Sequence, residues 1–314
     1  MSAERTPSRA KRSDWVSAMV VTSNLAFVLA PIYLAARVGA SPACIALWIW
    51  FGLGMQGILN LMHETAHLHV FRSRAANELL GRWILGPLMF ADFDRYREVH
   101  WAHHRNVGKP DDPKYSYKID IRGWAFARFV FRSLTLIEAI RKFRYVHGAK
   151  PTMKSSRDRA WLVRTALVQC VFVASLVLTV RGGALQVVLY AAFAYGFVYF
   201  YGILSLTVMA ANLRAIAEHQ LWGDRQLEVA DSAALRNLSS NPLTWLIFGS
   251  YGFSEHATHH RAPAIPYYLL PAEVRRLGAE HARAEFGYVS ILIGMIGSRG
   301  ENRSIRPARS LLTF

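Results

Sequence analysis

The residues best suited to carry out chemistry are histidines, and most of them lie in three short groups. Eight of its twelve histidines fall there: His63 and His67, then His100, His103 and His104, and finally His256, His259 and His260. The spacings i, i+3 and i+4 place imidazoles on one face of a helix, because a helical turn takes 3.6 residues. Neutral imidazole is a good ligand for Fe, Zn, Cu and Ni. Three such faces predict a metal centre with more than one ion.

The number of histidines bears on which metal is bound. A catalytic zinc ion needs three protein ligands and an open position. Eight or nine histidines exceed that need, whereas a pair of iron ions with four or five nitrogen ligands each fits the count. His219 stands alone but follows a long apolar segment, and we predict it as a further ligand. Isolated histidines such as His69, His147 and His281 are more typical of surface or packing positions.

Four apolar segments must position these groups. Hydrophobic residues make up 53% of the 314 residues, and the mean hydropathy is +0.16. A bilayer core about 30 Å thick needs about 20 apolar helical residues, which predicts transmembrane helices at about 15–36, 43–62, 161–180 and 184–211. The uncharged runs 38–62 and 182–213 are longer than this requirement. We therefore expect their ends to project from the membrane and to carry His63, His67 and His219.

The charge distribution predicts orientation. The net charge of +16 alternates along the chain: basic residues precede the first segment and are frequent in 63–159 and after 213, whereas Arg37 and Arg181 are alone in their turns. The positive-inside rule then places both termini in the cytoplasm. This alternation argues against nucleic-acid binding. Cys44 and Cys170 lie within predicted spans and suit packing. Arginine outnumbers lysine 30 to 7, which favours a bacterial origin and the inner membrane.

The remaining chain predicts a helical cap. We expect one membrane domain, 1–314, with cytosolic cap segments 63–159 and 212–314. Within the cap, 79–91 is too short to span and predicts an interfacial or re-entrant element, and 122–144 predicts helices on the membrane surface. The predicted fold is an all-α membrane protein, with four transmembrane helices and a cytosolic helical cap holding a histidine-rich di-metal site.

The motifs HxxxH, HxxHH and HxxHH, separated by a helical hairpin, resemble the membrane fatty acid desaturase superfamily, which includes related hydroxylases and ketolases. The resemblance runs from about residue 43 to 268. It implies two non-haem Fe ions, O2 as oxidant, a lipid or acyl substrate, and electrons from an external ferredoxin or cytochrome b5. Carried onto this sequence, it implies these iron ligands: His63, His67, His100, His103, His104, His219, His256, His259 and His260.

The sequence departs from the family pattern at two places. Where structurally described members have an asparagine four residues before the lone histidine, this chain has Ala215, and Asn212 lies seven residues before His219. The first group has Glu64 where many desaturases have aspartate. Carboxylates commonly orient imidazole ligands. The candidates for supporting the ligands are Glu64, Asn212, Glu218 and Glu255, with Asp92 and Asp94 as weaker ones.

The sequence leaves the reaction open. We expect no catalytic residue separate from the metal centre and, most simply, a fatty acyl desaturase that introduces a C=C bond. A hydroxylase or ketolase of a lipid, carotenoid or alkane would share the site, and a zinc-dependent membrane hydrolase or receptor is a more distant alternative. An apolar tunnel is expected to reach the site, with these aromatic candidates: Trp48, Trp50, Phe51, Trp245 and Phe253.

Overall fold

The structure is a computed structural model, and it describes residues 13–107, 109, 111–148, 159–220, 235–278 and 284–297. The basic residues expected to precede the first helix lie outside the described residues, as does His281. The side chain of His147 is also not described.

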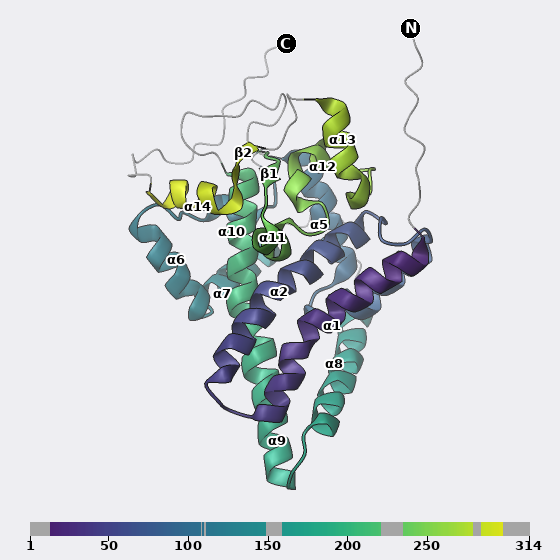
Figure 1. Cartoon of the computed structure of the whole chain (residues 1–314), viewed down its shortest axis with the longest axis vertical. Coiled ribbons are helices and arrows are strands. Elements are labelled where there is room, and N and C mark those ends of the chain that lie inside the picture. Colours follow the sequence, from purple (N-terminus) through teal and green to yellow (C-terminus); the bar gives the residue numbers. More distant parts are fainter. Residues whose placement is uncertain are drawn as a thin grey trace.

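Four long apolar helices form the lower part of the molecule in Figure 1. Among the described residues, four helices have the length and composition to cross a membrane: α1 (Asp14–Val38), α2 (Ala43–Ala66), α8 (Ala160–Thr179) and the run Ala184–His219. The prediction of four such helices is confirmed. The last run has 36 residues, or about 54 Å of helix at 1.5 Å per residue. It is therefore longer than a bilayer core.

The fourth span is one continuous helical run with wider turns in its middle. It comprises α9 (Ala184–Phe193), the π-helical segments η3 (Ala194–Tyr201) and η4 (Ile203–Thr207), and α10 (Val208–His219). Glycines let this run approach α2 closely: a Cβ on Gly202 would lie 2.7 Å from the ring of Phe51. Gln56 of α2 donates to the Thr207 carbonyl at 2.9 Å. These contacts fix the two helices that lead to the histidines.

A short helical segment packs against α8 without crossing the bundle. It comprises α3 (Arg74–Leu80), η1 (Gly81–Leu85) and α4 (Gly86–Leu88). Polar side chains from the spans hold it: Gln169 donates to the Pro87 carbonyl at 2.9 Å and Tyr199 to the Leu88 carbonyl at 2.7 Å. In an apolar setting each such bond satisfies a carbonyl that has no water partner. The helix carrying the second histidine group therefore begins from a fixed point.

The upper part of Figure 1 is a cap of shorter helices. Its elements are α5 (Phe93–Asn106), η2 (Tyr115–Lys118), α6 (Trp124–Leu134), α7 (Ile137–Gly148), α11 (Pro242–Thr244), η5 (Trp245–Gly249), η6 (Phe253–Glu255), α12 (His256–Arg261), η7 (Tyr267–Leu269), α13 (Leu270–Leu277) and α14 (Tyr288–Gly297). Helices α6 and α7 expose large apolar side chains, among them Trp124, Phe131 and Phe143. This composition is typical of helices at a membrane interface.

One feature differs from the all-helical prediction. Within the described part of the chain, β1 (Leu238–Ser239) and β2 (Ala284–Gly287) pair in parallel as a two-stranded sheet. The pairing satisfies backbone groups of two extended segments that meet over the cap. Strands this short carry no usable alternation of apolar and polar residues, so no periodic pattern predicts them.

Candidate metal centre

The four elements that carry the histidines end or begin at the same place. Helix α2 ends just beyond His63, and the chain turns at Leu68, whose φ is +62°. Helix α5 ends at Asn106 and carries His100, His103 and His104 in its last two turns. Helix α10 ends at His219, and α12 begins at His256. The imidazoles of the four elements therefore approach a common site from different directions.

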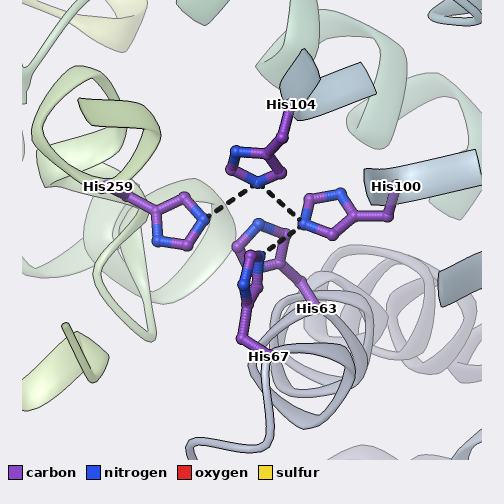
Figure 2. Close-up of side chains that lie close together, drawn as sticks. All are labelled: His63, His67, His100, His104 and His259. Carbon is purple, nitrogen blue, oxygen red and sulfur yellow. Dashed lines mark hydrogen bonds between the residues drawn. The ribbon is translucent and has the colours of Figure 1, made fainter. Parts of the chain in front are cut away.

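Five histidines form the first constellation. Figure 2 shows the rings of His63, His67, His100, His104 and His259 pointing toward one centre from α2, α5 and α12. Their Nε2 atoms are close: His67 to His100 is 2.6 Å, His100 to His104 is 3.0 Å, and His104 to His259 is 3.3 Å. Helix spacing explains part of the set, since His100 and His104 lie one turn apart on α5.

The other four histidines form the second constellation beside the first. His219 Nε2 lies 2.8 Å from His256 Nε2, which lies 3.2 Å from His260 Nε2. The ring of His103 lies 4.9 Å from the rings of both His219 and His260. His104 and His260 stack with their centroids 4.2 Å apart, which joins the two constellations. All nine histidines singled out in the sequence are thus brought together.

In each constellation one histidine donates a hydrogen bond to a buried carboxylate. His63 Nδ1 donates to Glu64 Oε1 at 2.9 Å, and His103 Nδ1 donates to Asp112 Oδ1 at 2.8 Å. Both carboxylates are buried. A proton held on Nδ1 leaves the Nε2 lone pair directed at the centre of the site. Asp112 was missed in the sequence, where Asp-Asp-Pro after the second histidine group signals only a turn.

The other proposed supporting residues lie in different settings. Glu218 Oε2 is 3.7 Å from His256 Nε2, and the Tyr288 hydroxyl donates to Glu218 Oε1 at 3.1 Å. Asn212 is buried on α10, and its Nδ2 has no hydrogen-bond partner among the described residues. Glu255 is buried immediately before His256.

The two weaker candidates serve the local structure of α5. Asp92 caps the helix, and Asp94 pairs with Arg82 at 2.8 Å and with Arg97 at 3.2 Å. The structure does not place these two side chains against the nine histidines.

A lysine that the sequence did not mark lies inside the second constellation. Lys114 Nζ is 2.6 Å from His219 Nε2 and 3.3 Å from His103 Nε2. Burial lowers the pKa of Lys114 to about 7. No spacing relates this residue to a histidine group, so no motif could have indicated it.

Burial keeps the histidines neutral. It lowers the pKa of His67 to about 2, of His104 to about 3 and of His103 to about 4, with neighbouring positive charge adding to the effect. It also lowers the pKa of His100, His256, His259 and His260 well below the ordinary range. A metal ion binds the neutral form of imidazole. The site is therefore ready to bind metal near neutral pH.

The donor set fits two metal ions. With metal–nitrogen bonds of about 2.1 Å, ligands at right angles are about 3 Å apart, which matches the Nε2 separations of 2.6 to 3.3 Å. His63 Nε2 is buried without a hydrogen-bond partner among the described residues. Such a lone pair is costly unless something binds it. The five histidines of the first constellation could hold one ion and the four of the second another.

Of the aromatic residues expected along a tunnel, Phe253 reaches the site. Its ring lies 4.6 Å from that of His63 and 5.3 Å from that of His256. Trp48 stacks on Tyr201 within the bundle, and Trp245 is half exposed on the cap.

Residues 40–291 match the family described as fatty acid desaturase. The chain belongs to the fatty acid desaturase family. No individually curated protein matches the chain significantly. The family match includes all nine histidines and supports an oxidoreductase of the desaturase or hydroxylase type that acts on lipid. Members of the fatty acid desaturase family generally hold two irons, in keeping with the two constellations.

Proposed function

We propose that this member of the family is an O2-dependent fatty acyl desaturase, with two Fe ions held by the nine histidines. The observation that carries the proposal is the convergence of nine buried or half-buried imidazoles into sets of five and four. A hydrolytic zinc site would leave most of these ligands unused, because it needs three and an open position. Two redox-active ions use all of them.

The residues of the chain would prepare the site in three ways. When bound, the iron pair supplies the redox chemistry that reduces O2 and oxidises an unactivated C–H bond. Glu64 and Asp112 hold the protons of His63 and His103 on Nδ1, so that the Nε2 lone pairs face the ions. Burial excludes water from the ligands and keeps the imidazoles uncharged. Phe253 presents an apolar surface beside His63, where an acyl chain could lie.

A lipid substrate is supported by where the site lies. His63 and His219 are carried by the ends of two candidate membrane-spanning helices. The shorter helices above the spans also expose large apolar side chains: Trp124 and Phe131 on α6, Trp245 on η5 and Ile293 on α14. We propose that an acyl chain enters from the membrane interface, and that an external ferredoxin or cytochrome b5 supplies the electrons.

We also propose one domain whose cap lies in the cytoplasm, with both termini on that side of a bacterial inner membrane. The charge alternation supports this orientation. Single cysteines at Lys109 in the cap and at Gly183 in the turn before α9 test it, after Cys44 and Cys170 are replaced; a Cβ at Gly183 meets open space. A membrane-impermeant thiol reagent should label position 183 in intact spheroplasts, and position 109 only after the membrane is broken. The reverse pattern would contradict the orientation.

Lipid profiling tests the reaction. The full chain is expressed in a bacterial host with simple lipids, together with a donor ferredoxin and its reductase. The expected product is an acyl chain two hydrogens lighter than the host's own. A product heavier by one oxygen atom would instead assign hydroxylation, which the family match allows equally. Unaltered lipids under conditions that load the metal site would contradict the proposal.

A further inference from the structure

The two constellations differ in one respect that concerns metal loading. The ring nitrogens of the five-histidine constellation contact one another and, through His63 Nδ1, a carboxylate. In the second constellation a lysine side chain intervenes. Lys114 Nζ lies within hydrogen-bond distance of the Nε2 atoms of His219 and His103.

The backbone around Lys114 is fixed at this place. Its N–H donates to Asp112 Oδ1 at 3.0 Å, the same oxygen that accepts from His103. Two residues further on, the Ser116 carbonyl accepts a hydrogen bond from Gln220 Nε2 at 2.6 Å, next to His219. The segment that carries Lys114 is therefore tied to both histidines that its side chain contacts.

The Lys114 side chain and a metal ion need the same lone pairs. Imidazole with its proton on Nδ1 has one basic lone pair, on Nε2. His103 is held in that form by Asp112. An N–H of Lys114 that donates to this lone pair occupies the direction along which a metal–nitrogen bond would form.

We propose that the Lys114 side chain occupies the second metal position, so that two ions load in order. The first ion binds in the five-histidine constellation, and the second binds the other constellation only in exchange for the Lys114 side chain. This inference rests on the proposed dinuclear metal site, but it does not depend on which lipid the enzyme oxidises.

Metal titration of the purified full chain tests the inference. The metal-free protein in detergent is titrated anaerobically with Co2+ and separately with Fe2+, and bound metal is measured by equilibrium dialysis and elemental analysis. We expect the wild-type protein to bind one ion at least tenfold more tightly than the second. In Lys114→Met the second ion should bind at least tenfold more tightly than in wild type, with the first unchanged.

Lys142→Met is the matched control. Lys142 lies on α7 and contributes positive charge near Lys114, so this variant removes an equal charge but leaves Lys114 in place. Its second-ion affinity should change by less than threefold. Lys114→Gln provides a second neutral variant if the methionine variant is not folded, as judged by circular dichroism.

Three results would overturn the inference. They are equal affinities for both ions in wild type, loss of the second ion in Lys114→Met and Lys114→Gln, and an equal gain in Lys142→Met. The first leaves a dinuclear enzyme in place, so the proposed function would survive it. A chain that binds no transition metal at all would overturn the proposed function together with the inference.

Discussion

Replacing Asp112 with asparagine removes the carboxylate that faces His103 while keeping the side-chain volume. In the structure His103 Nδ1 donates to Asp112 Oδ1 at 2.8 Å, and both side chains are buried. An asparagine can still accept this bond through its amide oxygen, but it brings no negative charge. It can also turn its NH2 group toward Nδ1, which would move the proton of His103 to Nε2 and remove the lone pair from the metal position.

The expected magnitude follows from that contact. Losing a carboxylate that orients a ligand histidine typically lowers metal affinity about 10- to 100-fold. A hydrogen bond to a charged group contributes about 1.5–3 kcal/mol, which corresponds to a similar range because 1.4 kcal/mol is about tenfold. We therefore expect Asp112→Asn to weaken binding of the ion in the second constellation about 10- to 100-fold, and to leave the ion among the five histidines largely unaffected.

Competition with a chromophoric chelator measures both dissociation constants in wild type and variant. Asp111→Asn is the matched control, because Asp111 is the neighbouring but exposed acid, and it should behave as wild type. Glu64→Gln is the reciprocal variant. It should weaken binding of the ion in the five-histidine constellation, since Glu64 accepts a hydrogen bond from His63. Equal affinities for Asp112→Asn and Asp111→Asn would refute the assigned role of the buried carboxylate.

Further predictions concern activity, pH and packing. His104→Ala and His260→Ala should each abolish product formation with membrane insertion intact, as fractionation and lipid analysis would show; turnover in either would count against their roles as ligands. Burial lowers the pKa of His104 from 6.5 to about 3. The neutral His104 side chain therefore stabilises the metal-free protein fully above pH 6.5. This stabilisation is lost as the pH falls toward 3, by about 1.4 kcal/mol per pH unit. Thermal unfolding should therefore begin at a lower temperature at pH 5 than at pH 7, and an equal or higher Tm at pH 5 would argue against a neutral buried imidazole. Gln169→Leu loses hydrogen bonds to the Pro87 carbonyl, to Tyr199 and to Tyr195. It should lower the free energy of unfolding by about 2 kcal/mol, at about 0.6 kcal/mol per bond within a membrane protein; an unchanged unfolding midpoint would show that these bonds contribute nothing.

The sequence predicts those parts of the fold and site that depend on the length of apolar runs or on helical spacing. Uncharged runs indicate the four long helices because a bilayer sets their length. Histidines at i, i+3 and i+4 indicate shared helix faces, and the overlong second and fourth runs indicate which helix ends carry His63 and His219. These features depend on local spacing alone.

The division of the ligands does not follow the sequence groups. His103 and His104 are neighbours, yet they belong to different constellations, because successive residues on a helix point about 100° apart. His259 of the third group completes the set formed by the first two. Which ring joins which ion depends on how α2, α5 and α12 meet, and that is a property of packing.

Two residues of the site could not be found from spacing. Asp112 and Lys114 follow α5 in a turn whose Asp-Asp-Pro sequence is fully explained by turn formation. Only the folded chain brings them against His103 and His219. Asp92 and Asp94 show the opposite error, since their nearness in sequence to the histidines reflects helix capping and ion pairing on α5.

The iron content of the purified full chain tests the central claim most directly. Protein isolated in mild detergent from iron-supplemented cells, or reconstituted anaerobically with Fe2+, should contain two iron atoms per chain by elemental analysis. His100→Ala, which removes a nitrogen from the five-histidine constellation, should reduce that content. A chain that retains one zinc and no iron after either preparation would contradict the account.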